Sequence, residues 1–369
     1  MEYTLLKNIA VIMMGQSPSS SSYNEEGVGI PFYQGNADFG ELYPTARIWC
    51  NEPKKIANKN DILISVRAPI GALNYATEQC CIGRGLASIT VKDEVLRNYV
   101  FRLLKANRNK LINQGSGSTF KAIGKSNLEE LRIPIVDEMT QKKIMNLMDA
   151  TEQIIRQRQI ELQLFDDLIK ARFIELFGDP KINDKSWDIG IISDYYEVKG
   201  GKRIPKGMGY TDAITTHPYL RASDMKNGTI IDDDIHYIDD EVYEHIKRYI
   251  VNGGDVYLTN VGVNLGMAGV IPDKYDGANL TENAVKLVPK KHNTIDGIFL
   301  SHYINSRGIQ NYINERKMAV GVPKLAIFRI ETMPILLPPP KLQKLFADFV
   351  HQVDKSKAAV QKALDETQL

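Results

Sequence analysis

The chain has 369 residues, of which 43% are hydrophobic and 25% are charged, and its formal net charge is only +1. This length allows two domains with separate cores, and the small net charge means that any surface suited to nucleic acid must be local. The cysteines Cys50, Cys80 and Cys81 form no CxxC pair, and the apolar run at 9–14 is too short for a secretion signal or a membrane span. We therefore expect a cytoplasmic protein that has no structural disulfide and does not cross a membrane.

Short β-type runs separated by Gly, Asn, Asp and Pro turns fill the first part of the chain. Apolar and β-branched residues predict strands at 61–66 and 86–91, and a helical pattern predicts a helix at 99–111. A Gly/Ser-rich loop at 115–121 and a further strand then lead into a long helix.

The long helix is predicted over 141–178, where apolar residues recur at steps of three and four and neither Pro nor Gly interrupts the run before Gly178. At 1.5 Å per residue it would be roughly 55 Å long, which is more than one small domain needs. The pattern fits a long core helix, or a coiled-coil spacer between two globular lobes.

The second half of the chain repeats the order of the first. Strands are predicted at 255–259 and 285–288 and a helix at 298–313, and Pro338-Pro339-Pro340 then precedes a second long helical run to Leu369. Matching motifs lie from 187 residues apart (Gln34 to Arg221) to 202 residues apart (Ile133 to Ile335). This separation indicates a duplicated domain, and chance similarity of short apolar runs is the alternative.

These boundaries divide the chain into four parts. They are a first domain at 1–138, a spacer helix at 139–180, a second domain at 181–338 and a second spacer helix at 339–369, which we expect to be shortened because it lacks most of the counterpart of LFDDLIKARFIELFG. Two helices with similar apolar stripes are natural partners for an antiparallel pair.

Sequence signatures of catalysis are not found. There is no phosphate-binding Gly-x-x-x-x-Gly-Lys motif and no nucleophile elbow, and the six histidines are not at metal-ligand spacing. The glycine-rich run 262–269 is interpreted as a tight turn. The acidic run 232–234 could chelate a cation, but we interpret it as a solvated or partner-facing acidic face. We expect no catalytic residue, no metal and no cofactor bound by this chain.

Local basic segments precede both long helices. Residues 101–125 contain six basic residues and no acidic one. In the second half, 199–206 forms a basic, glycine-rich turn, and the segment before the second long helix carries Arg307, Arg316, Lys317, Lys324 and Arg329 against the lone Glu315. The loop 115–121 adds hydroxyl and backbone N–H groups that suit phosphate oxygens. Solvated helix faces are the alternative. Arg67 and Arg84 lie in turns flanked by Gly or Pro, where an arginine suits bidentate contact with guanine or a structural salt bridge.

Three motifs resemble the specificity subunit of type I restriction–modification systems: Ser65-Val-Arg-Ala-Pro-Ile-Gly71, Cys81-Ile-Gly-Arg-Gly-Leu-Ala87 and Gly117-Ser-Thr-Phe-Lys-Ala-Ile123. The resemblance covers essentially the whole chain, and Gly321-Val-Pro-Lys-Leu325 stands at the place of the third motif in the second copy. It implies an α+β fold in which two similar mixed α/β target-recognition domains are separated by two long antiparallel coiled-coil helices, with a pseudo-twofold internal repeat.

The resemblance also implies a non-catalytic subunit that binds double-stranded DNA. Each domain would read one half of a bipartite target, and the helices would fix the gap and dock two modification subunits carrying S-adenosylmethionine. Restriction (motor–nuclease) subunits would join for cleavage. A two-lobed coiled-coil scaffold that binds proteins is the alternative.

Two sets of residues follow as candidates. The expected DNA contacts are polar or cationic residues at loop-like positions: Gln34, Arg67, Arg84, Ser116, Ser118, Lys121, Lys125, Lys202, Arg203, Arg221, Asn260, Asn264 and Lys324. The expected docking surface is the polar face of the long helix: Gln153, Arg156, Gln157, Arg158 and Gln159.

Overall fold

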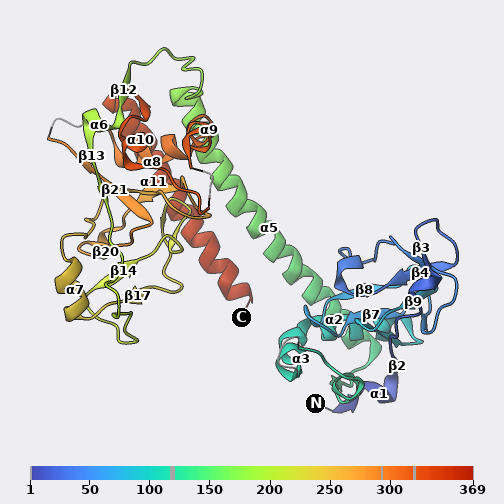
Figure 1. The fold of residues 1–369 in the computed structure, drawn as a ribbon. Helices are drawn as coiled ribbons and strands as arrows, with labels where there is room; N and C mark the ends of the chain where they lie inside the picture. The colour runs from blue at the N-terminus through green and yellow to red at the C-terminus, as the bar shows by residue number, and fades with distance from the viewer. Residues whose placement is uncertain (1, 117–120, 292–293, 319–320, 369) are drawn as a thin grey trace. The chain divides into compact units, whose positions relative to one another are not determined.

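The computed structural model describes residues 2–116, 121–291, 294–318 and 321–368. The chain divides into two compact units, Met1–Arg156 and Gln157–Leu369, which we call unit 1 and unit 2 (Figure 1). Within the residues that the structure describes, no helix combines the length and the apolar character that crossing a membrane requires.

Unit 1 is built on a four-stranded antiparallel sheet. Its order is β2 (Val11–Met14), β10 (Leu86–Thr90), β7 (Ile62–Ser65) and β8 (Leu73–Tyr75). Alternate residues of β7 point to opposite faces, as strand geometry requires. Ile62 and Ile64 pack in the core that includes Tyr99 and Leu104 of α2 (Glu94–Ala106), whereas Leu63 packs with Tyr33 of a second sheet. The central strands are therefore buried on both faces.

The second sheet of unit 1 has five short strands in the order β3 (Tyr23–Asn24), β5 (Trp49–Cys50), β4 (Ile30–Tyr33), β9 (Cys80–Ile82) and β6 (Ile56–Ala57). A two-stranded ladder of β1 (Tyr3–Leu5) and β11 (Arg132–Pro134) closes the unit. The remaining helices are α1 (Leu6–Ile9), α3 (Arg108–Gln114) and α4 (Lys125–Glu129), with 3-10 turns at Ser20–Ser22 and Asn36–Asp38.

Unit 2 repeats this topology. Its main sheet runs β13 (Tyr196–Gly200), β21 (Ala284–Pro289), β18 (Val256–Thr259) and β19 (Ala268–Val270), again antiparallel throughout. The second sheet, β17 (His236–Tyr237), β14 (Pro218–Leu220) and β20 (Asn279–Leu280), keeps a parallel pair, β14–β20, that corresponds to β4–β9. The closing ladder is β12 (Ile189–Ile191) with β22 (Pro334–Leu336). The shared strand order confirms the internal repeat.

The other elements of unit 2 are the helices α6 (Ile192–Tyr195), α7 (Asp240–Ile246), α8 (Gly297–Asn305), α9 (Arg307–Arg316) and α10 (Ile327–Glu331), the hairpin β15 (Met225–Lys226)–β16 (Thr229–Ile230) and a 3-10 turn at Asp273–Tyr275.

The predicted helices at 99–111 and 298–313 are each two helices. Unit 1 has α2 and α3, which meet at Asn107, and unit 2 has α8 and α9, which meet at Ser306. Both pairs also begin earlier than predicted, because an aspartate caps the first helix. Asp93 accepts from the Leu96 backbone N–H at 2.7 Å, and Asp296 accepts from the Ile298 N–H at 2.8 Å.

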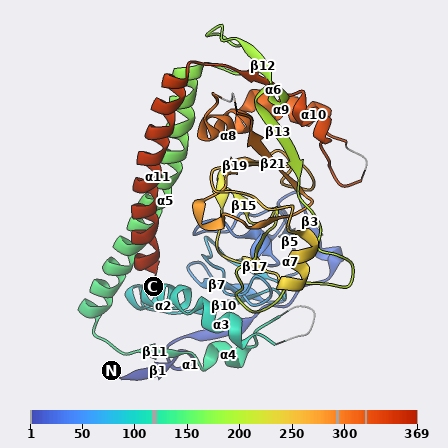
Figure 2. The same ribbon diagram turned by 90° about the vertical axis from the view of Figure 1, so that its left-hand side faces the viewer.

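The helix α5 (Glu138–Phe177) has 40 residues, and its first part belongs to unit 1 and its second part to unit 2. Within unit 2 it lies beside α11 (Pro340–Gln368) (Figure 2). The rings of Phe173 and Phe177 each lie 5.5 Å from the ring of Phe346, whereas Asp166 pairs with Lys357 at 2.6 Å. The end of α5 thus meets the start of α11, so the two segments are antiparallel there.

All three cysteines lie in unit 1 and are buried free thiols. Burial raises the pKa of the Cys80 thiol to about 12 and that of Cys81 to about 11. The thiolate is the reactive form of cysteine, so these side chains are inert while unit 1 stays folded.

Candidate nucleic-acid interface

Five segments meet at one edge of each unit. In unit 1 they are 15–17, 33–35, 66–67, 83–85 and 121–123, and in unit 2 they are 201–203, 220–222, 260–261, 281–283 and 323–325. We call each set a loop cluster. Each cluster lies where strands of both sheets end, so its exposed side chains have a rigid base.

The same backbone hydrogen bonds hold both loop clusters. In unit 1 the Gly83 N–H donates to the Tyr33 carbonyl at 2.8 Å, and in unit 2 the Thr281 N–H donates to the Leu220 carbonyl at 3.0 Å. Three further bonds in each unit follow the same pattern: Gln16 to Ile82, Val66 to Gly85 and Ile123 to Val66 in unit 1, and Lys202 to Leu280, Asn260 to Asn283 and Leu325 to Asn260 in unit 2. These bonds relate the two clusters position by position.

Each position of one loop cluster therefore has an equivalent position in the other. Gln34 corresponds to Arg221, Arg84 to Glu282 and Gln16 to Lys202. Arg67 corresponds to Val261, because Arg67 forms a β-bridge with Ala122 in unit 1 and Val261 forms the equivalent bridge with Lys324 in unit 2. The backbone is conserved between the units while the side chains differ. Such an arrangement suits two sites that recognise different ligands of one class.

A glycine brings the first segment close to the fourth in both clusters. A Cβ added to Gly15 would lie 2.2 Å from the Gly83 carbonyl oxygen, and one added to Gly201 would lie 2.0 Å from the Thr281 carbonyl oxygen. Both distances are far shorter than any real carbon–oxygen contact, so only glycine fits at either position.

The unit 1 cluster is cationic. The side chains of Gln34, Arg67, Arg84 and Lys121 are exposed, and so is that of Ser116 beside them. The Arg84 N–H donates to Ser17 Oγ at 3.4 Å, which ties its turn to the first segment. Lys125 pairs with Glu129 at 3.2 Å, and Ser118 lies outside the described residues. Exposed guanidinium groups on a fixed backbone suit base edges or phosphates.

Two cations of the basic segment 101–125, Arg102 and Lys105, bind acidic residues of α5. Lys105 donates to Glu152 of α5 at 2.8 Å, and Arg102 donates to the same carboxylate at 3.1 Å and also pairs with Asp149. Burial opposes ionisation of Glu152, but these two cations keep its pKa below the usual range. Arg102 and Lys105 therefore link α2 to α5, and a phosphate contact by either would first have to break these bonds.

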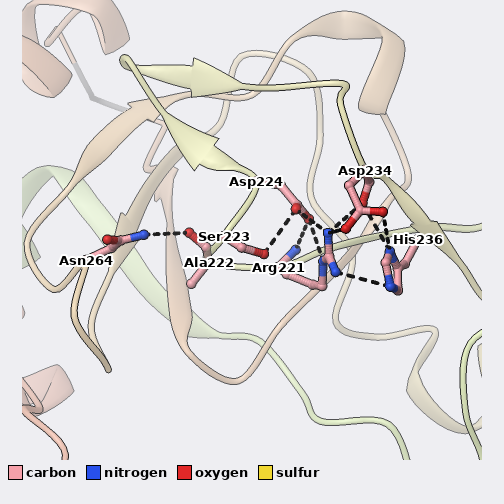
Figure 3. Close-up of polar contacts among 7 residues, drawn as sticks. All are labelled: Arg221, Ala222, Ser223, Asp224, Asp234, His236 and Asn264. Carbon is pink, nitrogen blue, oxygen red and sulfur yellow. Dashed lines mark hydrogen bonds and ion pairs between the residues drawn. The ribbon is translucent and has the colours of Figure 1, made fainter. Parts of the chain in front are cut away.

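Arg221 of unit 2 is held by an internal network (Figure 3). Its Nε and Nη2 donate to the two carboxylate oxygens of Asp224 at 3.1 and 2.7 Å, and Nη2 also donates to Asp234 Oδ2 at 3.0 Å. Its Nη1 lies 3.1 Å from His236 Nε2. The hydrogen bond from Arg221 lowers the pKa of Asp234. A DNA contact by Arg221 would first have to break these bonds.

The side chains of the acidic run 232–234 are all exposed, as expected from the sequence, and two of them also bind partners within unit 2. Asp234 binds Arg221, and Asp232 binds Lys274 and Tyr275. Among the described residues, no three His, Cys, Asp or Glu side chains are grouped so that they could hold a metal ion.

The two asparagines expected to contact DNA play different parts. Asn260 is 5% exposed and its amide donates to the Leu325 carbonyl at 3.4 Å, so it cannot reach a base edge unless the backbone moves. Asn264 is half-buried and its amide donates to the Ala222 carbonyl at 3.4 Å (Figure 3), which links the turn after β18 to the 220–222 segment. The structure therefore gives Asn260 a structural role, whereas Lys202 and Lys324 are exposed as expected.

Glu282 is a residue of the loop cluster that sequence reasoning missed. Arg203 Nε donates to its Oε1 at 2.5 Å, and Thr281 Oγ1 donates to its Oε2 at 3.2 Å. A cavity of about 410 Å³ lies beside it, lined by residues that include Tyr210, Tyr219 and Asn283. Aligning Asn279-Leu-Thr-Glu-Asn-Ala-Val285 with Cys81-Ile-Gly-Arg-Gly-Leu-Ala87 would have revealed it.

The predicted docking residues are mostly exposed on α5. Gln153, Gln157 and Gln159 face solvent, whereas Arg158 is half-buried. Arg156 is also exposed and forms an ion pair with Glu41 of the same unit.

Comparison with known proteins identifies the family. The model of the type I restriction modification DNA specificity domain matches residues 1–164 and 184–367. The chain is 24% identical over 369 aligned residues to the type I restriction enzyme MjaIX specificity subunit of Methanocaldococcus jannaschii, covering 92% of this chain and 83% of that protein. It is 42% identical over 176 residues to the provisionally assigned MjaX specificity subunit of the same organism, covering 47% of this chain and only 41% of that protein.

The fold has a solved counterpart. The S subunit of a type I restriction–modification system from M. genitalium aligns with 100% of this chain and 92% of its own, at a TM-score of 0.53 and 16% sequence identity. This similarity bears on the fold alone, and it agrees with the two mixed α/β units described above.

Proposed function

We propose that this chain, which belongs to the type I restriction modification DNA specificity domain family, recognises a bipartite sequence in double-stranded DNA, with one half read by each unit. The observation that carries the proposal is the pair of loop clusters, which share one hydrogen-bonded backbone and differ in their side chains. A duplicated backbone with diverged side chains is what reading two different half-sites requires.

The side chains of the clusters have the chemistry of base and phosphate contacts. Arg67 and Arg84 present exposed guanidinium groups, which are the commonest partners of guanine in the major groove. Exposed lysines such as Lys121, Lys202 and Lys324 supply charge for the phosphate backbone. A scaffold that binds only proteins would have no need of two loop clusters that share one backbone frame and carry exposed cations such as Arg84 and Lys324.

The long helices complete the proposal. We assign to α5 and α11 an antiparallel coiled coil, supported by the Phe173–Phe346 and Asp166–Lys357 contacts in unit 2. In this assignment α5 fixes the gap between the half-sites, and its face at Gln153, Arg156, Gln157, Arg158 and Gln159 docks two modification subunits. Those partners would bind S-adenosylmethionine and transfer its methyl group, and restriction subunits would join them for cleavage.

The test is selection from a pool of random duplexes by the full chain, with and without its modification subunit. The expected result is enrichment of two short motifs at a fixed separation when the modification subunit is present. Salt-sensitive binding with no motif, in both arms, would refute sequence recognition. Capture of the modification subunit with no DNA enrichment would favour the scaffold.

A further inference from the structure

We propose that Glu282 is a specificity-determining residue of unit 2, whose carboxylate accepts a hydrogen bond from the exocyclic amino group of a base in the major groove. The inference rests on the proposed function and goes beyond it, because it assigns a base chemistry to one position of the target. It starts from the equivalence of Glu282 with Arg84.

The backbone places these two side chains at one position. Leu86 donates to the Gly83 carbonyl at 3.0 Å and Ala284 donates to the Thr281 carbonyl at 3.3 Å, so residues 84 and 282 are each the first of the two central residues of the same turn. The two turns also have the same neighbours. The N–H of residue 16 or 202 bonds to the strand residue just before the turn, and the N–H of residue 66 or 260 bonds to the third residue of the turn. A ligand that meets Arg84 in unit 1 would meet Glu282 in unit 2.

One oxygen of the Glu282 carboxylate, Oε2, is fixed by buried neighbours, whereas the residue that covers the other oxygen, Oε1, can be displaced. Thr281 Oγ1 at 3.2 Å and Tyr219 Oη at 3.5 Å contact Oε2, and the side chain is 29% exposed. Arg203 covers Oε1, but the Arg203 side chain is 78% exposed. An exposed guanidinium can turn away at small cost, since exposed ion pairs contribute little. Oε1 is therefore the atom that a base can reach.

Glu282 is ionised at neutral pH. Burial raises its pKa, but the hydrogen bond and charge of Arg203, together with hydrogen bonds from the Glu282 backbone and Thr281, hold the pKa below the usual range. The neighbouring Arg221 does not compete for the carboxylate, because Asp224 and Asp234 already bind its guanidinium. The site thus offers an acceptor that carries a full negative charge.

An ionised carboxylate selects bases by charge and hydrogen-bond polarity. It can only accept, so it favours the amino groups of cytosine N4 and adenine N6 and repels the O6 and N7 acceptors of guanine. Arg84 has the opposite polarity. When DNA binds, Arg203 moves from Glu282 toward a phosphate, which offsets the repulsion between the carboxylate and the backbone.

The experiment repeats the duplex selection with the full chain and its modification subunit, comparing wild type with Glu282→Ala, Glu282→Gln and Glu282→Arg. In wild type, one position of the unit 2 half-motif should be cytosine or adenine. Glu282→Ala should reduce the preference there by about tenfold or more, and Glu282→Gln should weaken it less. Glu282→Arg should shift that position toward guanine.

Two controls make the result specific. Glu244→Gln changes a glutamate of α7 that pairs with Lys247 and is absent from the loop cluster, and it should leave the motif unchanged. Arg203→Ala should lower affinity for all sequences and keep the base preference. The half-motif of unit 1 and the other positions of the unit 2 half-motif must persist in every variant, which shows that both units are folded.

The outcomes separate the two proposals. If wild type selects no bipartite motif, the proposed function itself fails. If wild type selects a motif that Glu282→Ala and Glu282→Arg both leave unchanged, Glu282 only positions Arg203 and the inference is overturned. A change confined to one position of the unit 2 half supports it, and the identity of that base distinguishes cytosine from adenine.

Discussion

Asp61 and Asp255 close the same turn in the two units. Asp61 Oδ2 accepts from the Asn58 N–H at 2.8 Å, and Asp255 Oδ2 accepts from the Asn252 N–H, also at 2.8 Å. Each aspartate directly precedes the central strand of its main sheet, β7 or β18. Asp255 also forms an ion pair, with Lys286 Nζ at 3.3 Å, and both side chains of that pair are nearly buried; no ion pair is formed by Asp61 among the described residues.

We expect Asp255→Ala to be more destabilising than Asp61→Ala. Loss of the turn hydrogen bond costs about 1–2 kcal/mol in either variant. Asp255→Ala also leaves the Lys286 ammonium without its partner, which adds about 2 kcal/mol or more. Urea denaturation of the full chain measures both, with Asp255→Asn as the control that keeps the acceptor and removes the charge. Equal losses for the two alanine variants would contradict the importance of the Lys286 pair.

Arg84→Ala should relax one position in the half of the target read by unit 1. A bidentate arginine–guanine contact discriminates by about 1–3 kcal/mol, so the preference at that position should fall by about tenfold or more while the unit 2 half is unchanged. Arg67→Ala should act likewise at another position of the same half. Duplex selection measures both. An equal loss in both halves would point to misfolding or to general loss of charge.

Lys121 and Lys105 should differ in their effect on the salt dependence of binding. Lys121 is exposed in the unit 1 loop cluster, and Lys105 is neutralised by Glu152 at 2.8 Å. Lys121→Ala should reduce the slope of log K against log salt by about 0.9, the amount expected for one lost phosphate contact. Lys105→Ala should leave the slope unchanged. The comparison requires titrations at several salt concentrations, and a reversed order would show that Lys105 leaves Glu152 on binding.

Lengthening α5 by one heptad should change the gap in the target and not its half-motifs. Duplicating residues 156–162 adds seven residues at 1.5 Å each, or about 10 Å, which matches about three base pairs of B-DNA. A heptad also nearly restores the direction of each helix face. Duplex selection with the modification subunit gives the new gap. An unchanged gap in a variant that still selects both half-motifs would exclude α5 as the spacer.

His302 should make the stability of unit 2 sensitive to acid. Burial and the nearby Lys357 ammonium lower its pKa to about 4, against an opposing effect of Asp166. Between pH 6.5 and pH 4 the unfolded chain therefore gains a proton that the folded chain does not. Folding should lose up to roughly 3 kcal/mol across this window and nothing further below it.

The matched variant is His302→Phe, which keeps a ring beside Phe346, whose centroid lies 5.2 Å from that of His302. Burial raises the pKa of Asp354, which acts in the opposite direction, but Asp354 is present in both proteins and cancels in the difference. Denaturation at several pH values should show the difference between wild type and variant growing as the pH falls to 4. Parallel curves would mean that His302 is charged in the folded state.

The sequence predicts strands, long helices and duplication well, because these depend on local periodicity and on motif order. It fails where tertiary partners decide. From the amino-acid sequence, Arg102 lies in a basic segment that suits phosphates and Arg221 is expected to contact DNA, but in the folded chain Arg102 binds Glu152 and Arg221 binds Asp224. The breaks at Asn107 and Ser306 were missed because the apolar pattern runs on through them.

The candidate site shows the same division. Arg84 was predicted because an arginine flanked by glycines is conspicuous, whereas Glu282 at the equivalent place was not, since a search for positive charge passes over a carboxylate. Asn260 was predicted from its position after a strand, but its burial depends on residue 325, far away in the chain. Position in the fold, not residue type, identifies the members of the two clusters.

Because of where the thiols lie, their chemical labelling reports the opening of unit 1 only. Since Cys50, Cys80 and Cys81 all lie in unit 1, a thiol reagent added to the native protein labels the chain only when that unit opens. The two tryptophans, in contrast, are divided, with Trp49 in unit 1 and Trp187 in unit 2. Labelling rates and tryptophan fluorescence together can therefore time the opening of each half of an intact chain without any engineered probe.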